Sequence, residues 1–301
     1  MSFRVVVPGS TSNLGSGFDT VSAALSLYLR LSVIESGGRD LIWPAGWELA
    51  DESNAILQAM QRTARELGFT LPGLRIEVEN EIPLRRGLGS SAAALVAGVK
   101  IVERLSGKSL TEAEILDLVF PLEGHPENLA ASLLGGWAIS RVNGDGMRSE
   151  RLRAKLAVRF VAAIPETGVS TAEARAILPE NYSRADTVFN LQRCALLTFA
   201  VSEGRTDLLA EATADRLHQK YRAGLIPGAE TVLSRKELPA AVAASVHSLT
   251  VSGSGSTLLA LVAGNGDEVG EWMVGLLAEA GTPATFRVLD LDVKGARVLE
   301  R

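Results

Sequence analysis

The chain has 301 residues, of which 47% are hydrophobic and 22% charged, and its formal net charge is −5. This length suffices for a large core and favours about two domains. Aromatic residues make up only 5%, basic residues are scattered, and no apolar stretch reaches the ~18 residues of a membrane span. Nucleic acids and membranes are therefore not expected as partners. With one cysteine and no secretory leader, the chain is expected in the cytoplasm.

The first half of the chain alternates strand and helix signals. The β-branched run that starts at Phe3 predicts a strand ending at Pro8 in a polar loop, and a second strand follows over 23–36, before turn signals at Gly37 and Gly38. Apolar spacing of three and four residues predicts a helix over 53–68. Further along, strands are expected at 74–83 and 137–142, and helices at 90–107, 111–124 and 125–136.

The second half has a different order of elements. A buried strand is expected at 155–165, followed by mostly helical sequence over 171–218. Residues 245–264 read as strand, tight glycine turn and strand, and a helix at 267–281 precedes a last strand at 284–292. This order is typical of a ferredoxin-like split βαβ sheet. The change of pattern near residue 150 predicts a domain boundary there. Cys194, in an apolar helical run, is expected to be a buried thiol.

The stretch 83–93, PLRRGLGSSAA, has the composition of a phosphate-binding loop. Its glycines allow close approach of the backbone to an anion, and Gly89 is expected to lie against phosphate. The helix that follows would present free N–H groups at its start. The lysine of the common P-loop is missing. The dinucleotide pattern G-x-G-x-x-[GA] also fits the loop, but weakly, because Glu103 falls inside a helix instead of following a strand.

A triphosphate cradle explains why two serines, Ser90 and Ser91, follow the glycines. A serine hydroxyl in the first helical turn can bind Mg²⁺, and Mg²⁺ on phosphate takes only one or two protein oxygens. One of these serines and Glu123 are therefore the candidate metal ligands. For Glu123 the alternative is a solvated residue at a helix end.

Four segments together resemble a known family: 7–19 (VPGSTSNLGSGFD), 83–93, 123–136 (EGHPENLAASLLGG) and 251–257 (VSGSGST). In order and spacing they are similar to the signature segments of the GHMP small-molecule kinases. Within that superfamily the first and third segments resemble the homoserine kinase branch, as do residues 170–179 and 215–228. The resemblance spans the chain from Val5 to about Leu261.

The resemblance implies an α+β fold, with a GHMP kinase ATP-binding domain at residues 1–150 that contains a left-handed crossover. A ferredoxin-like domain would occupy residues 151–301. The implied reaction is ATP-dependent phosphorylation of the L-homoserine hydroxyl to O-phospho-L-homoserine, for threonine biosynthesis. ATP, L-homoserine and Mg²⁺ are the implied ligands, and a homodimer is one option for the assembly.

The resemblance also implies site residues. The phosphates of ATP would lie on Pro83, Leu84, Arg85, Arg86, Gly87, Leu88, Gly89, Ser90, Ser91, Ala92 and Ala93, with Ser91 and Glu123 holding Mg²⁺. Homoserine would lie among Asn13, Asp19, His125, Asn128, Thr171, Arg175, Arg222 and Gly255.

These side chains suit a zwitterion. Arg175 and Arg222 can form forked bonds with its carboxylate, while Asp19 and Asn128 can engage its ammonium or hydroxyl. Asp19 is the one candidate general base, because the amide of Asn128 cannot take up a proton, but Asp19 could equally only orient the hydroxyl. Two other functions stay open: a GHMP kinase for mevalonate, a sugar or shikimate, and a non-catalytic sensor of ATP and a metabolite.

Overall fold

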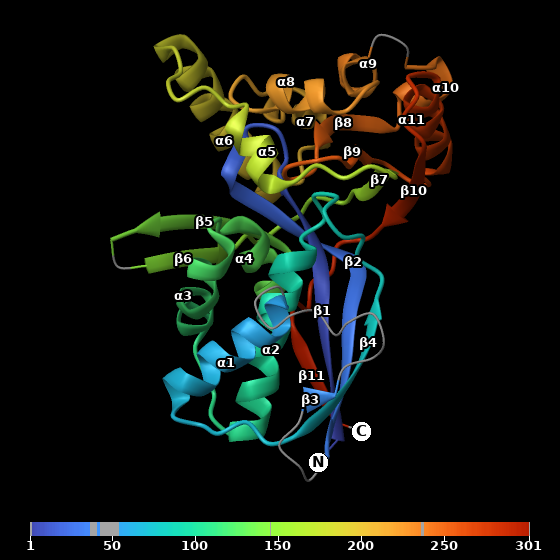
Figure 1. Ribbon diagram of the computed structural model, residues 1–301. Coiled ribbons are helices and arrows are strands. Elements are labelled where there is room, and N and C mark those ends of the chain that lie inside the picture. Colours follow the sequence, from blue (N-terminus) through green and yellow to red (C-terminus); the bar gives the residue numbers. More distant parts are fainter. Residues whose placement is uncertain (1, 37–40, 43–53, 145, 236–237, 301) are drawn as a thin grey trace.

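The chain builds two sheets, one above the other in Figure 1. The computed structural model describes residues 2–36, 41–42, 54–144, 146–235 and 238–300. Within them, the first sheet has seven strands in the order β11–β1–β2–β4–β3, and β5 and β6 branch from β2. Its strands are β1 (Ser2–Asn13), β2 (Gly17–Glu35), β3 (Leu41–Ile42), β4 (Leu74–Asn80), β5 (Trp137–Asn143), β6 (Gly146–Arg151) and β11 (Arg297–Glu300).

Strand β1 does not end at Pro8, where a loop was expected. Its pairing with β2 continues to Asn13, and the register shifts between Pro8 and Gly9. Proline lacks an N–H for the ladder and is tolerated at such an irregularity. The polar segment 9–13 is therefore strand, and a tight turn with positive φ at Asn13, Leu14 and Gly15 leads into β2. The long hairpin places this segment at the end of the sheet that faces the second half of the chain.

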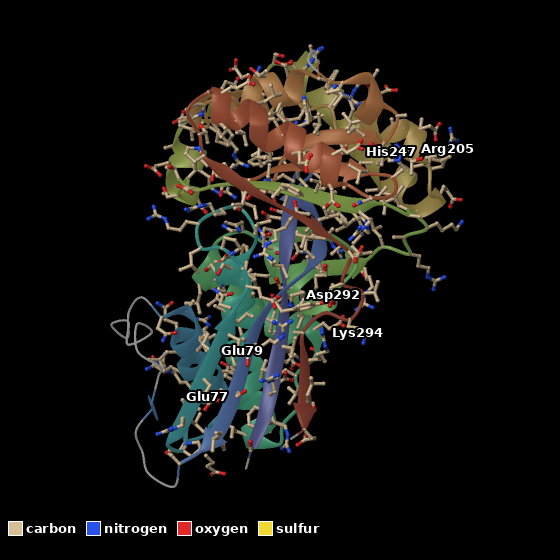
Figure 2. The ribbon with its side chains drawn as sticks, turned by 90° about the vertical axis from the view of Figure 1, so that its right-hand side faces the viewer. Glu77, Glu79, Arg205, His247, Asp292 and Lys294 are labelled. Atoms are coloured by element: carbon tan, nitrogen blue, oxygen red, sulfur yellow. The ribbon has the colours of Figure 1, made fainter. Side chains whose placement is uncertain are left out.

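Four helices cover one face of the first sheet (Figure 1): α1 (Ala55–Leu67), α2 (Ser90–Ser106), α3 (Glu112–Glu123) and α4 (Glu127–Leu134). Helices α1 and α2 pack so closely that a Cβ on Gly98 would lie 2.4 Å from the carbonyl oxygen of Ile56. Figure 2 looks at the opposite face, where the exposed Glu77 and Glu79 of β4 lie. The core of this half thus lies between the sheet and the helices.

The second sheet has the order β10–β7–β9–β8, with every pair antiparallel. Numbered along the chain this is 4-1-3-2, so the split βαβ prediction is confirmed, and helices with mainly antiparallel sheets make the fold α+β. The strands are β7 (Arg159–Pro165), β8 (Val246–Val251), β9 (Leu258–Val262) and β10 (Ala284–Leu289). The helices of this half are α5 (Thr171–Ala176), α6 (Arg184–Glu203), η1 (Thr206–Leu208), α7 (Leu209–Ala212), α8 (Gln219–Arg222), η2 (Ala223–Leu225), α9 (Ala229–Ser234), α10 (Ala240–Ala243) and α11 (Asp267–Glu279).

Three strands were not expected from the sequence: β3, β6 and β11. After β10, where the last strand was placed, the chain returns to the first sheet and β11 pairs with β1. The two halves also meet where the amide of Gly253 donates to the carbonyl of Ser12, at 3.0 Å. The domain boundary near residue 150 stays a prediction, and the turn expected at residues 37 and 38 lies outside the described residues.

Two smaller expectations can be compared with the structure. Cys194 lies in α6 and is half-buried, and its burial raises the pKa of the thiol. Of the helices in the described part of the chain, none combines the length and the hydropathy that a membrane span requires.

Candidate active site

A pocket lies where the end of the β1–β2 hairpin meets the loop before α2, the start of α4 and the start of α5. Most of the predicted site residues line it, although they come from segments far apart in the sequence. The lining consists of Asn13, Asp19, Pro83, Arg85, Arg86, Gly87, Leu88, Gly89, Ser90, Ser91, Glu123, His125, Glu127, Asn128, Val169, Ser170, Thr171, Arg175, Arg222 and Ser254.

The loop before α2 is shaped by contacts with the rest of the protein. Gly87 and Gly89 both have φ of 71°, in the left-handed region that favours glycine. A Cβ on Gly87 would lie 2.1 Å from the carbonyl oxygen of Ser252, and a Cβ on Gly89 would lie 2.1 Å from Ser10 Oγ. Gly89 is therefore required by its contact with β1, and the expected approach of its backbone to phosphate stays a prediction.

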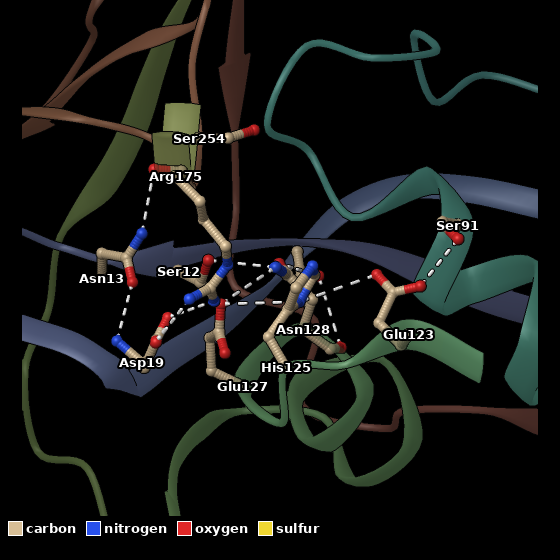
Figure 3. Close-up of polar contacts among 12 residues, drawn as sticks. Ser12, Asn13, Asp19, Ser91, Glu123, His125, Glu127, Asn128, Arg175 and Ser254 are labelled. Carbon is tan, nitrogen blue, oxygen red and sulfur yellow. Dashed lines mark hydrogen bonds and ion pairs between the residues drawn. The ribbon is translucent and has the colours of Figure 1, made fainter. Parts of the chain in front are cut away.

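The two predicted metal ligands, Ser91 of α2 and Glu123 at the end of α3, meet at the N-terminus of α2. Ser91 Oγ donates to Glu123 Oε2 at 2.7 Å, so the two oxygens lie together beside the free N–H groups of the first helical turn (Figure 3). Burial raises the pKa of Glu123, and His125 and Ser91 counteract this. Among the described residues, no group of three or more His, Cys, Asp or Glu side chains is arranged to hold a metal. Two oxygens fit a Mg²⁺ whose other ligands are phosphates and water.

Three polar residues at the start of α4 or just before it line the pocket: His125, Glu127 and Asn128. The Asn128 amide is fixed, because Oδ1 accepts from Ser10 Oγ at 2.9 Å and Nδ2 donates to Ser12 Oγ at 3.0 Å. His125 Nδ1 is buried without a hydrogen bond, and burial lowers the pKa of the imidazole. Glu127 is only 3% exposed, and burial, then the charge of Asp19, raises its pKa to about 7.

Asp19 and Arg175 form a two-bond ion pair at the other side of the pocket, with Arg175 Nη2 2.9 Å from Oδ1 and Nη1 3.1 Å from Oδ2. Asn13 supports it by accepting from the Asp19 amide at 2.9 Å, while its own Nδ2 donates to the Gly253 carbonyl at 2.9 Å. Asn13 thus ties the aspartate to the glycine turn of the second half.

Arg222 is buried, and its guanidinium is partly committed to the protein. Nη1 donates to the Gly253 carbonyl at 2.8 Å and lies 3.4 Å from His218 Nδ1, and Nε donates to the Ala174 carbonyl at 3.4 Å. Within the described part of the chain Nη2 has no such partner, so this nitrogen is the one available to a ligand. Its charge also lies over the Phe18 ring, at 5.1 Å from the centroid. Burial lowers the pKa of Arg222.

Some predicted residues lie outside the pocket. Leu84 is 60% exposed, the side chains of Ala92 and Ala93 are in the core, and Ser254 lines the pocket in place of Gly255. Arg86 lines it, but Nε donates to the Pro165 carbonyl at 2.7 Å and Nη2 to the Glu166 carbonyl.

Sequence reasoning missed Glu127 as a site residue, and also Ser170 and Ser254. Glu127 stands inside the segment 123–136 that carried the resemblance, beside Asn128. Its position beside Asn128 is the one sequence signal that could have indicated Glu127, because burial of its carboxyl group depends on the packing of α4 against β1.

Comparison with known proteins identifies the family. The family model described as GHMP kinases N terminal domain matches residues 54–136. A homoserine kinase of Trichormus variabilis is 39% identical over 301 residues, which cover 98% of each chain. The chain belongs to the homoserine kinase family. A second relative, the homoserine kinase of Deinococcus radiodurans, is 42% identical over 261 residues, covering 85% of this chain and 83% of that one.

Solved structures agree with this membership. The crystal structure of homoserine kinase from Cytophaga hutchinsonii has a TM-score of 0.87 at 25% identity, covering 99% of this chain and 97% of that chain. A mevalonate kinase from Methanococcus jannaschii has a TM-score of 0.67 at 14% identity, covering 96% and 98%, and shares the fold alone. The resemblance to GHMP kinases drawn from four short segments is therefore confirmed over nearly the whole chain.

Proposed function

We propose that this protein transfers the γ-phosphoryl group of ATP to the side-chain hydroxyl of L-homoserine. The product is O-phospho-L-homoserine, an intermediate of threonine biosynthesis. One observation carries the proposal: two kinds of binding group line the same pocket. The N-terminus of α2 and the loop before it suit phosphates, and fixed charges of both signs suit a small zwitterion. The homoserine kinases that match 98% of the chain support this substrate.

On the ATP side, the backbone N–H groups of loop 83–89 and of the first turn of α2 would bind the phosphates. Ser91 and Glu123 would hold Mg²⁺, whose chemistry there is to neutralise charge on the phosphate oxygens. The hydrogen bond between these two residues keeps both oxygens at the helix N-terminus. Phosphoryl transfer depends mainly on such alignment and neutralisation.

On the substrate side, Arg222 offers Nη2 to the homoserine carboxylate, and the unused N–H groups of Arg175 can add a second contact. Asn128 is held by Ser10 and Ser12, so its amide can orient the hydroxyl but cannot accept the proton. Asp19 has both carboxylate oxygens bonded to Arg175, which supports an orienting role over proton uptake.

Two other functions remain testable. A GHMP kinase for mevalonate or a sugar would not need charges of both signs in the pocket. A non-catalytic sensor would not need Ser91, Glu123 and Asp19, all of which line the pocket. A coupled ADP-release assay with homoserine, serine, threonine, mevalonate and shikimate separates the three. We expect release with homoserine above all others, whereas binding of ATP without release would indicate a sensor.

A homodimer and a cytoplasmic location stay predictions. Light scattering on the purified protein tests the first: a dimer has twice the chain mass of 31.8 kDa. Cell fractionation tests the second.

A further inference from the structure

A buried histidine lies behind Arg222, outside the pocket. His218 directly precedes α8, the helix that ends with Arg222, and it is 0% exposed. It does not belong to the pocket lining, so it acts on a ligand there only through other residues. A polar ring in such a place takes its hydrogen-bond partners from the protein. The partners of its two nitrogens therefore show what the ring does.

The ring nitrogens of His218 have partners of opposite kinds. Nε2 lies 2.8 Å from the carbonyl oxygen of Gly15, which can only accept, so Nε2 carries the proton. Nδ1 lies 3.4 Å from Nη1 of Arg222, which can only donate, so Nδ1 is the acceptor. The neutral imidazole satisfies both partners with a single proton. Burial lowers the pKa of His218, in agreement with the neutral form, although the charge of Asp215 opposes this shift.

The bond to Nδ1 completes the set of contacts that hold the guanidinium of Arg222. One N–H of Nη1 faces the Gly253 carbonyl at 2.8 Å, and the N–H of Nε faces the Ala174 carbonyl at 3.4 Å. The other N–H of Nη1 faces His218. Three acceptors thus fix the plane of the guanidinium, and among the described residues only Nη2 keeps both N–H groups for a ligand.

The other side of the imidazole is anchored to the turn between β1 and β2. This turn packs against the segment before α8, since a Cβ on Gly15 would lie 1.8 Å from the Thr213 carbonyl oxygen. The imidazole also stacks on Phe18, with ring centroids 5.0 Å apart and an angle of 21° between the planes. Rotation of the ring would break the bond to Gly15 and the stacking, so Nδ1 stays directed at Arg222.

We propose that His218 is a positioning residue, whose Nδ1 fixes the guanidinium of Arg222 so that Nη2 meets the carboxylate of the amino-acid substrate. The inference rests on the proposed function and adds a residue that does not itself contact the substrate. Without an acceptor at Nδ1, one N–H of Nη1 is buried and unpaired, and the guanidinium turns to satisfy it. The carboxylate then loses its alignment with Nη2, whereas a nucleotide at the N-terminus of α2 is unaffected.

Two substitutions separate the two nitrogens. In His218→Asn the amide oxygen can replace Nδ1, whereas in His218→Gln the longer amide reaches the place of Nε2 and leaves no acceptor at Nδ1. We expect His218→Gln to raise KM for L-homoserine by ~10-fold, the lower end for a lost hydrogen bond to a charged group. Its kcat and its KM for ATP should stay within about threefold, as should KM for homoserine in His218→Asn. The control is His247→Asn, on β8 outside the pocket lining, which should resemble the wild type.

A double-mutant cycle tests whether His218 acts through Arg222. In the Arg222→Lys background Nη1 is absent, so adding His218→Gln should change KM for homoserine by less than about twofold. A further rise of ~10-fold in that background would overturn the proposal. Equal KM values for His218→Asn and His218→Gln would also overturn it, as would an equal loss for ATP, because a merely structural role affects both variants and both substrates alike.

Nitrogen-15 NMR of the wild-type imidazoles does not depend on the folding of any His218 variant. The chain has three histidines, and His125→Gln and His247→Asn assign the other two signals. At pH 7 the spectrum should show His218 neutral, with its proton on Nε2, whereas a proton on Nδ1 would overturn the proposal. A wild type that releases no ADP with homoserine contradicts the proposed function instead, and the tautomer still tests the bond to Arg222.

Discussion

Asp19 of β2 and Arg175 of α5 form a two-bond ion pair, at 2.9 and 3.1 Å, that joins the two halves of the chain across the pocket. Asp19 has φ of 52°, in the left-handed region that few residues other than glycine occupy. The backbone is thus bent where it presents this carboxylate. A carboxylate held in this way is oriented, and this favours a positioning role for Asp19 in catalysis.

The first prediction concerns this pair. Asp19→Asn breaks the fork with Arg175 and should lower kcat/KM for homoserine by ~10²-fold, while the pH–rate profile keeps its shape. A general base would instead lower kcat by ~10²–10⁴-fold and remove the acidic limb. Steady-state kinetics from pH 5.5 to 9 separate the two roles. Asp290→Asn is the matched control, because Asp290 forms an exposed pair with Arg159 and its loss should have little effect.

The second prediction concerns Arg222. Arg222→Lys keeps the positive charge but cannot replace the bonds of Nη1 and Nε to the Gly253 and Ala174 carbonyls while also reaching a ligand. We expect KM for homoserine to rise by ~10-fold or more, with KM for ATP within about twofold, and a lower melting temperature. Equal losses for both substrates would assign Arg222 to structure alone.

The third prediction concerns the packing role of Gly89. Gly89 and Gly107 have nearly the same φ, 71° and 69°. A Cβ on Gly89 would lie 2.1 Å from Ser10 Oγ, whereas a Cβ on Gly107 would have no neighbouring atom within 4 Å. Alanine at either position should cost ~1 kcal/mol for the backbone conformation, and Gly89→Ala should cost ~1–3 kcal/mol more through the clash. Urea denaturation measures the difference. Equal destabilisation of the two variants would contradict the packing role.

The fourth prediction concerns Ser91. Ser91→Ala removes an oxygen at the N-terminus of α2 together with its bond to Glu123. Turnover at saturating ATP should fall by ~10²-fold and require more Mg²⁺ for half-maximal rate. A Mg²⁺ titration of kcat checks this, with Ser106→Ala at the far end of the same helix as control. An unchanged Mg²⁺ requirement would separate Ser91 from the metal.

The fifth prediction is a pH dependence of stability. Burial raises the pKa of Glu127 to about 7, so between the unfolded value of 4.5 and about 7 the folded protein binds more protons than the unfolded chain. Stability contributed by this group is therefore full below pH 4.5 and is lost as pH rises through about 7. The melting temperature of Glu127→Gln should exceed that of the wild type by a margin that grows from pH 5 to pH 8. Burial raises the pKa of Glu123 as well, and the charge of Glu127 adds to this, so removing that charge shifts the difference in the same direction. A difference independent of pH would contradict this account.

The sequence was sufficient to predict those parts of the fold that depend on patterns among residues close together in the chain. Alternation and helical spacing predicted the split βαβ order and the helices α2 to α4, and four polar segments indicated the family. The continuation of β1 past Pro8 and the return of β11 could not be predicted, since both depend on pairing with distant strands. Glu127 and the Asp19–Arg175 pair were missed for the same reason. Burial and mutual distance follow from how α4, α5 and β2 pack, and no local pattern encodes them.

The measurement that tests the central claim most directly is ³¹P NMR of the product. Purified protein is incubated with ATP, Mg²⁺ and an equimolar mixture of L-homoserine, mevalonate and shikimate. The account predicts one new phosphomonoester signal, coupled to the terminal methylene protons of homoserine, which appears as ATP is converted to ADP. A phosphomonoester on mevalonate or shikimate, or ADP formed with inorganic phosphate alone, would contradict it.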